Sequence, residues 1–277
     1  MFAVLPTLLT LGNAVCGFGA ITCAAQWWGP NLPTSLFAAS CFIFLAMVFD
    51  ALDGSTARRL NKTSEFGAQL DSLCDAISFG AAPAFVMLQF ALASDYHPRL
   101  LWLVAALYVV CTVLRLARFN VQADEVDAPG SFKGLPSPAA AGTIASFPVM
   151  AFGLKHLEYT EHNLSWEGFA TWLEPVTVAL LPLVTLAVAC LMVSRVRYTH
   201  TFHQLVRGRR NGPYLIKLVF AVAVIFVMPQ ISAPVLFGWY AFAPPVWALW
   251  TGRVAPLFDK RTDQAPAPDG MQTDTGL

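Results

Sequence analysis

Eight long apolar stretches make up most of this chain and limit the folds open to it. They cover residues 6–26, 34–58, 66–92, 98–119, 136–154, 173–194, 214–228 and 231–250. A helix needs about 20 mostly apolar residues to cross the hydrocarbon core of a bilayer. The pattern therefore predicts an all-α, polytopic membrane protein, a bundle of about eight transmembrane helices.

The composition supports this class. Of the 277 residues, 56% are hydrophobic and only 12% are charged, whereas soluble domains carry about 25% charged residues. At this length we expect residues 1–255 to form one membrane-embedded domain. Residues 256–277 are polar and rich in Pro, Gly, Asp and Thr. They lack apolar side chains to bury, so we expect a disordered tail there.

The basic residues are distributed unequally between the two sides of the predicted bundle. Eight spans place successive loops on alternate sides, and only Arg99 and Lys155 of the 17 Lys and Arg fall on the side away from the termini. Loops rich in Lys and Arg stay in the cytoplasm. We therefore expect both termini, and the even-numbered helix ends, on the cytoplasmic side of the membrane.

Four aspartates lie in the second and third apolar stretches, where acids are costly and therefore expected to be functional. Asp50 and Asp53 are three residues apart, and Gly67, Asp71 and Asp75 are spaced by four. On a helix each set shares one face. The connection between the two stretches is short, so the helices are expected to be antiparallel neighbours. The four acids then converge toward the cytoplasmic end of the bundle.

Four carboxylates packed together would repel one another, and divalent cations would remove that penalty. Hard oxygen ligands suit Mg²⁺, Mn²⁺ or Ca²⁺, and two ions could bridge a diphosphate. Gly54 and Ala57 leave room for a large ligand, and Arg58 offers a planar fork for phosphate. The pattern predicts phosphoryl transfer at a membrane surface. In the alternative reading, the acids reach water and pair with Arg58, Arg59 or Lys62.

The spacing of these residues resembles the signature of the CDP-alcohol phosphotransferase family. The matching positions are Asp50, Asp53, Gly54, Ala57, Arg58, Gly67, Asp71 and Asp75. The resemblance implies a six-helix family core followed by two C-terminal helices, and a homodimer. It implies that the first three aspartates bind metal and that Asp75 binds metal or acts as general base. It also implies that Gly54, Ala57, Arg58 and Gly67 line the site for the CDP-lipid.

Four further segments, residues 10–18, 115–120, 132–141 and 191–194, resemble the membrane-embedded phosphatidylserine synthases of that family. This resemblance implies that the hydroxyl of serine attacks CDP-diacylglycerol and gives phosphatidylserine and CMP. CDP-diacylglycerol, L-serine and membrane lipids are then the expected partners, with no nucleic acid. The expected location is the cytoplasmic membrane of a bacterium, with the active site on the cytoplasmic side.

A basic cluster follows the fourth apolar stretch. Arg115 and Arg118 are three residues apart near its end, Asn120 follows them, and Lys133 lies beyond a short loop. We expect these four residues to bind the carboxylate of serine or a phosphate. Ordinary anchoring of a cytoplasmic loop is the alternative for the cluster.

Two polar residues inside apolar stretches have two readings each. We expect Asn13 to belong to the CDP-lipid site and to contact the nucleotide or the headgroup. A hydrogen bond between helices would explain a polar residue at this position equally well. Ser78 lies one turn beyond Asp75 and either faces the site or bonds a helix backbone.

Two other functions compete with serine transfer. The same chemistry could use another acceptor alcohol: glycerol 3-phosphate, inositol phosphate or choline. A transporter coupled to ions is the rival from a different class. Transporter ion sites lie near the middle of the bilayer on broken helices, often within inverted repeats. Here the acids lie toward one face, and the two halves of the sequence show no repeat.

Overall fold

The computed structural model describes residues 4–26, 31–60, 65–123, 132–160, 167–194, 197–198 and 228–250. The predicted tail, and the expected seventh span apart from its last residue, lie outside these ranges. The described elements are α1 (Val4–Ala24), α2 (Leu32–Leu60), α3 (Glu65–Asp75), the π-helical turn η1 (Ala76–Ala81), α4 (Ala82–Ala91), α5 (Pro98–Ala123), β1 (Phe132–Lys133), α6 (Ser137–Thr160), α7 (Glu167–Val193), β2 (Arg197–Tyr198) and α10 (Pro229–Trp250).

The predicted helical membrane class is confirmed. Within the described residues, 6 helices are long and apolar enough to cross a membrane, and they correspond to the first six predicted spans. The third of these spans is continuous through α3, η1 and α4, from Glu65 to Ala91. The helix α10 matches the eighth apolar stretch but is not one of the 6. The count of eight spans is therefore not confirmed and stays a prediction.

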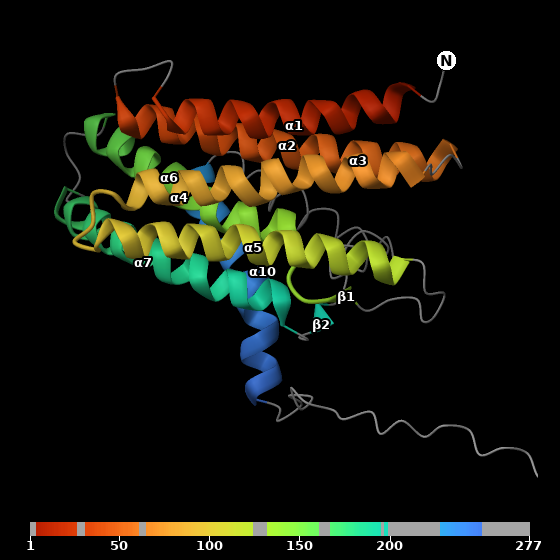
Figure 1. The fold of residues 1–277 in the computed structure, drawn as a ribbon. Helices are drawn as coiled ribbons and strands as arrows, with labels where there is room; N and C mark the ends of the chain where they lie inside the picture. Colours follow the sequence, from red (N-terminus) through yellow and green to blue (C-terminus); the bar gives the residue numbers. More distant parts are fainter. Residues whose placement is uncertain are drawn as a thin grey trace, which may run out of the picture.

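The spanning helices run side by side, with α1, α2 and α3 together along one side of the bundle and α5 and α7 along another (Figure 1). The packing of α1 on α2 is the most extensive between any two described elements. The end of α2, the start of α3 and the end of α5 meet at the same end of the bundle, where α1 also begins (Figure 1). Chain direction alone therefore brings all four aspartates to one end.

The π-helical turn η1 interrupts the third span directly after Asp75. The backbone N–H of Ala82 donates to the carbonyl of Ile77, five residues earlier, and the hydroxyl of Tyr108 donates to the carbonyl of Phe79 at 2.9 Å. Both Tyr108 and Phe79 are fully buried. Single π-turns inside α-helices are frequent at functional sites. A buried tyrosine from α5 therefore braces the widened turn that follows the fourth acid.

The loop before α6 is pinned to the end of α7. Strands β1 and β2 pair antiparallel, and the backbone N–H of Leu135 donates to the carbonyl of Leu191 at 3.1 Å. Between them Gly134 has a φ of +92°, in the region that favours glycine. A Cβ there would also collide with the carbonyl oxygen of Met192. This loop delivers the chain to Ser137, the first residue of α6.

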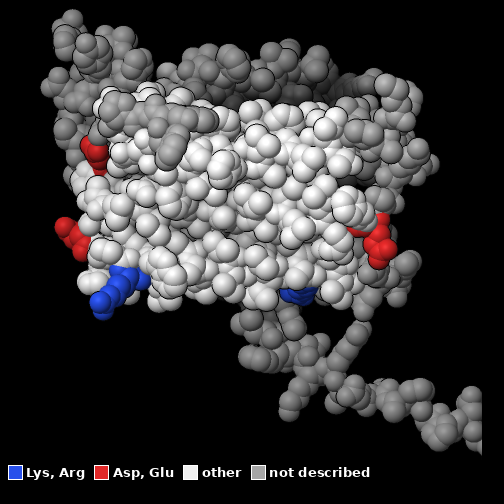
Figure 2. Space-filling view, turned by 45° about the horizontal axis from the view of Figure 1, so that its top comes forward, with Lys and Arg blue, Asp and Glu red and all other residues white. Residues whose placement is uncertain are grey.

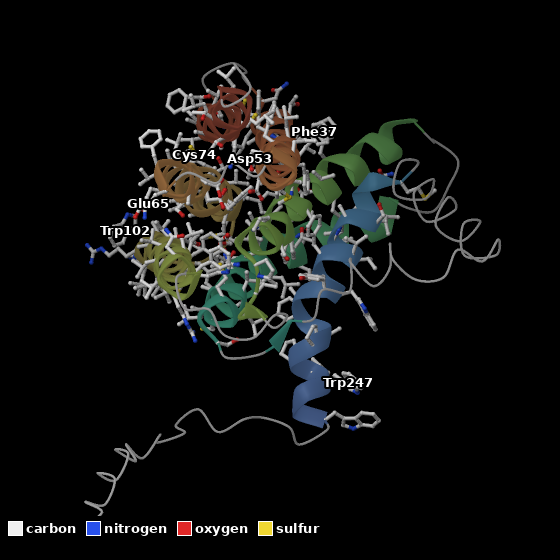
Figure 3. All side chains as sticks on the ribbon, turned by 90° about the vertical axis from the view of Figure 1, so that its right-hand side faces the viewer. Phe37, Asp53, Glu65, Cys74, Trp102 and Trp247 are labelled. Atoms are coloured by element: carbon white, nitrogen blue, oxygen red, sulfur yellow. The ribbon has the colours of Figure 1, made fainter. Side chains whose placement is uncertain are left out.

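The helix α10 packs against α6 through a close contact. The ring of Phe237 lies over Gly142, where any Cβ would collide with it, and stacks on Phe44 of α2 with centroids 5.6 Å apart. Beyond this contact α10 crosses the direction of the spanning helices and projects away from them, with Trp247 on the projecting part (Figure 3). Trp247 and Trp250 are largely exposed. The first half of α10 is thus part of the folded core.

The outer surface fits a lipid environment. In the face that Figure 2 shows, Lys, Arg, Asp and Glu of the described residues lie at the margins, and the broad middle carries none of them. Large apolar side chains are exposed along the spanning helices, among them Val15, Phe18, Trp102 and Leu183. An apolar band between charged margins is expected for helices surrounded by lipid tails.

Candidate active site

Three of the four predicted aspartates converge. Asp50 and Asp53 come from the last turns of the second span, and Asp71 comes from α3. Each offers one carboxylate oxygen, and these oxygens all lie within 4.8 Å of one another. Figure 3 shows Asp53 between α2 and the neighbouring helix α3. The convergence predicted from helical spacing is therefore confirmed for these three acids.

The chemistry of this group fits a hard divalent cation. Asp53 Oδ2 and Asp71 Oδ1 are both buried and have no hydrogen-bond partner among the described residues. Buried polar atoms normally find a partner, and an unpaired carboxylate oxygen is especially costly. A cation bound between oxygen ligands would satisfy both atoms and offset the repulsion among the acids. The three carboxylates could thus hold an ion.

Asp75 has different surroundings from the other three acids. It is buried, with 8% of its surface exposed, and within the described part of the chain it is not a member of the metal-binding group. Instead, the side-chain amide of Asn13 donates from Nδ2 to Asp75 Oδ1 at 2.9 Å. A helix that precedes the acids by tens of residues thus supplies the partner of the fourth acid. Of the two readings of Asn13, the hydrogen bond between helices is the one that the structure contains.

The same helix also reaches the three-acid group. The hydroxyl of Thr10 takes part in a hydrogen bond with the Asp53 carboxylate, and Thr10 is nearly buried. Thr10 and Asn13 are three residues apart, so they lie on one face of α1. The face of α1 toward the site therefore supports one acid of α2 and one acid of α3.

Arg115 lies beside the acids. Its Nη1 donates to the hydroxyl of Ser137 at 2.8 Å, while its Nε is buried and has no hydrogen-bond partner within the described part of the chain. The guanidinium interacts electrostatically with the carboxylates of Asp75 and Asp50. A planar guanidinium with an unused, buried N–H is suited to bind a carboxylate or phosphate.

Asn120 is placed differently from the prediction. Its Nδ2 donates to the hydroxyl of Ser72 at 2.9 Å, which ties the end of α5 to α3 next to Asp71. The Ser72 hydroxyl has one proton to donate, and both the Ala68 carbonyl and Asn120 Oδ1 lie 3.1 Å away. Arg118, two residues before Asn120, is partly exposed. Asn120 is therefore a link between helices beside the site.

The remaining predicted residues are only partly described. Gly54 and Gly67 lie in α2 and α3 near the acids. Ala57 and Arg58 belong to α2 and Lys133 belongs to β1, where its backbone is in register with Arg197. The side chains of Ala57, Arg58 and Lys133 lie outside the described part of the structure, so their roles stay predictions.

Sequence reasoning missed Thr10, Ser72 and Ser137 as partners of site residues. Thr10 and Ser137 fall inside the segments 10–18 and 132–141, whose resemblance to a family marked them as important without giving a role. For Ser72 the only signal in the sequence was its position next to Asp71. Each of these hydroxyls bonds a residue at least 22 positions away, and no local spacing rule reports such a contact.

Comparison with known proteins gives a consistent assignment. The family model described as CDP-alcohol phosphatidyltransferase matches residues 3–183. An archaetidylserine synthase from Methanothermobacter thermautotrophicus is 35% identical over 199 residues, 71% of this chain and 70% of that protein. A CDP-diacylglycerol–serine O-phosphatidyltransferase from Helicobacter pylori is 30% identical over 236 residues, 85% and 86% of the two chains. A protein of the same name from Bacillus subtilis is 36% identical over 136 residues, 49% and 70%.

Proposed function

This chain belongs to the CDP-alcohol phosphatidyltransferase family, and we propose that it transfers the phosphatidyl group of CDP-diacylglycerol to the hydroxyl of L-serine. The products are phosphatidylserine and CMP. The observation that carries this proposal is the convergence of Asp50, Asp53 and Asp71 beside the separately held Asp75. This arrangement occurs within a membrane bundle whose relatives are named for serine transfer.

The names of the relatives support the acceptor more strongly than the donor. The Methanothermobacter protein is named for archaetidylserine and the Helicobacter protein for CDP-diacylglycerol and serine. These names differ in the lipid and share serine. The acceptor therefore rests on all three relatives, whereas diacylglycerol as the lipid rests on the Helicobacter and Bacillus proteins. Glycerol 3-phosphate, inositol phosphate and choline remain the alternatives to test.

In the proposed reaction the residues of the site have separate roles. Asp50, Asp53 and Asp71 would hold a divalent cation, Mg²⁺ or Mn²⁺, which when bound neutralises charge on the diphosphate. We propose two ions because two could bridge a diphosphate; the three-acid group could hold one of them. Gly54, Ala57, Arg58 and Gly67 would line the site for the CDP-lipid in the pattern of the family.

Asp75 would act as the general base. The oxygen of the serine hydroxyl forms a bond to the lipid-linked phosphorus, and the bond from that phosphorus to the CMP oxygen breaks. The hydroxyl proton passes to the Asp75 carboxylate, and CMP leaves with the electron pair. A carboxylate is a weak base for an alcohol, so the hydroxyl has to be positioned at the phosphorus before the proton moves.

Arg115 is the proposed partner of the serine carboxylate. Its Nη1 already donates to Ser137, and no described residue is a partner of its buried Nε. The guanidinium and Asp75 interact electrostatically, so they lie close enough to contact the two ends of one small molecule. Serine carries a carboxylate a few bonds from its hydroxyl, which matches an arginine on one side and a base on the other.

Orientation and assembly are part of the proposal. The acids lie at the end of the bundle where the second and fourth spans end, and Lys and Arg concentrate on that side in the sequence. The positive-inside rule then places the active site on the cytoplasmic side, where CDP-lipids and serine are available. The homodimer and the bacterial source stay predictions of the resemblance.

Purified protein tests the function directly. Incubated with CDP-diacylglycerol, Mn²⁺ or Mg²⁺ and radiolabelled serine, it should release CMP and produce a labelled phospholipid in equal amounts. A chelator should stop both. Parallel reactions with glycerol 3-phosphate, inositol phosphate and choline identify the acceptor. Turnover with one of these alcohols and none with serine would overturn the acceptor and keep the chemistry. Release of no CMP with any alcohol would overturn the proposed reaction.

A further inference from the structure

Asn13 is more deeply buried than any of the acids around it. Its exposed fraction is 0%, against 5% for Asp53 and 8% for Asp75. Its Nδ2 donates to Asp75 Oδ1 at 2.9 Å, across 62 positions of sequence. A side-chain amide in this position cannot reach water for an alternative partner, so its bond to Asp75 is a fixed part of the packing between α1 and the third span.

A second contact from the same span holds the backbone of Asn13. The hydroxyl of Ser78, three residues beyond Asp75, donates to the backbone carbonyl of Asn13 at 2.8 Å. One turn along α1, a Cβ on Gly17 would collide with Ser78 Oγ and lie 2.7 Å from Ser78 Cα. The two backbones therefore approach closely at this point. Asn13 and Gly17 on one helix meet Asp75 and Ser78 on the other, which fixes the backbone of Asn13 beside Asp75, while the amide itself is held by its bond to Asp75.

Asp75 lies near enough to the other acids to interact with them electrostatically, but it has a partner of its own. Among the described residues, Asp50, Asp53 and Asp71 form the group that could hold an ion, whereas one oxygen of Asp75 is occupied by an amide. An amide is a neutral donor and does not take up a proton at ordinary pH. It fixes a carboxylate without supplying a charge that would pair with it. Oδ1 is then engaged, and Oδ2 is left for the reaction.

We propose that Asn13 is a positioning residue for the transfer reaction. Its amide holds Asp75 by Oδ1, so that Oδ2 faces the acceptor hydroxyl and takes its proton as the new bond to phosphorus forms and CMP leaves. This inference rests on the proposed function. The competing role is the expected contact of Asn13 to the CDP-lipid, and the two roles have different kinetic effects.

Two variants of Asn13 distinguish these roles. Asn13→Leu keeps a side chain of similar size without the donor, and Asn13→Ala removes both. A hydrogen bond to a charged group is typically worth about one to two factors of ten. We expect kcat to fall by about 10- to 100-fold in both variants, with KM for serine and for CDP-diacylglycerol changed by less than about threefold.

A matched control is Ser40→Ala on α2. Ser40 is as fully buried as Asn13, but its hydroxyl donates within its own helix, to the Leu36 carbonyl at 2.9 Å. The Ser40→Ala variant should lose some thermal stability and keep the wild-type kcat.

Ser78→Ala loosens Asn13 without removing its amide, and we expect kcat to fall by about 3- to 10-fold, the loss typical of one neutral hydrogen bond. Ser78→Ala is the decisive variant if neither Asn13 variant folds.

All variants are compared with the wild-type protein in the serine assay, with stabilisation against heat by CDP-diacylglycerol as the measure of folding and lipid binding. A folded Asn13→Leu protein with wild-type kcat would overturn the inference, and so would unchanged kcat in Ser78→Ala. A raised KM for CDP-diacylglycerol at unchanged kcat would assign Asn13 to the lipid instead. If the wild-type protein uses another alcohol, the proposed acceptor is wrong, and the comparison is made with that alcohol. Wild-type protein inactive with every alcohol overturns both proposals.

Discussion

Arg115 Nη1 donates a hydrogen bond of 2.8 Å to the side-chain hydroxyl of Ser137, which links the last part of α5 to the first residue of α6. Ser137 is almost completely buried, so the bond fixes one edge of the guanidinium. The buried Nε of Arg115 has no hydrogen-bond partner among the residues that the structure describes, and we propose that it binds the ligand. The orientation of the proposed serine contact is therefore set by the loop that delivers Ser137.

Arg115→Lys tests that contact. Lysine keeps the positive charge and loses the planar fork, so one hydrogen bond of a charged pair is lost. We expect KM for serine to rise by about 10-fold or more and KM for CDP-diacylglycerol to change little. The matched control is Arg99→Lys, an exposed position in the first turn of the same helix. A rise in KM for the lipid substrate instead would place Arg115 at the diphosphate.

Asp75→Asn tests the role of the base. The amide cannot accept the hydroxyl proton, and general bases typically contribute about 100- to 10 000-fold. We expect kcat to fall within that range while binding of CDP-diacylglycerol, measured by thermal stabilisation in the presence of Mn²⁺, is retained. Loss of lipid binding together with turnover would show that Asp75 is chiefly a metal ligand.

Asp71→Asn tests the metal site. One of three convergent carboxylates is replaced by a neutral amide, so the affinity for the cation should fall by at least about tenfold. Titration of activity against Mn²⁺ should show a higher half-saturating concentration, with part of the rate recovered at high Mn²⁺. Asp95→Asn, on an exposed loop, should titrate like the wild type. The same Mn²⁺ dependence in both variants would exclude Asp71 as a ligand.

Gly134→Ala tests the loop before α6. The φ of +92° is strained for any residue with a side chain, which costs about 1–3 kcal/mol, and the new Cβ would meet the Met192 carbonyl. We expect a lower unfolding temperature in detergent and, because Ser137 moves with the loop, a raised KM for serine. Gly238→Ala in α10 is the control, since nothing lies within 4 Å of its Cβ position. Equal stability of the two variants would contradict this account.

Helical spacing was enough to predict the convergence of the acids. Asp71 and Asp75 share a face because α3 is regular up to Asp75, and the π-turn begins only at the next residue. The short connection between the second and third spans made the two helices neighbours. Local periodicity and chain direction therefore determine which end of the bundle holds the site and which three carboxylates approach one another.

The division of roles among the acids could not be predicted from spacing. Asp75 differs from Asp71 because Asn13 reaches it from a helix 62 positions earlier, and the angle between those helices depends on packing along their whole length. The close approach depends on a missing side chain at Gly17, which in the sequence is one of several glycines. Similarly, Asn120 is a polar residue beside a basic cluster in the sequence, but its partner is Ser72 on another helix.

The contact between Gly142 and Phe237 lies partly outside the region that the family model covers, because that region ends at residue 183. Residue 142 lies in the region that the family model covers, and the ring that occupies the space of its missing side chain comes from Phe237 of α10. The two positions are therefore constrained as a pair. Among related chains that have an equivalent of α10, a larger residue at position 142 should accompany a smaller one at 237. In related chains that lack α10, glycine at position 142 should no longer be favoured. An alignment of both groups of chains would test whether the residues at positions 142 and 237 vary together.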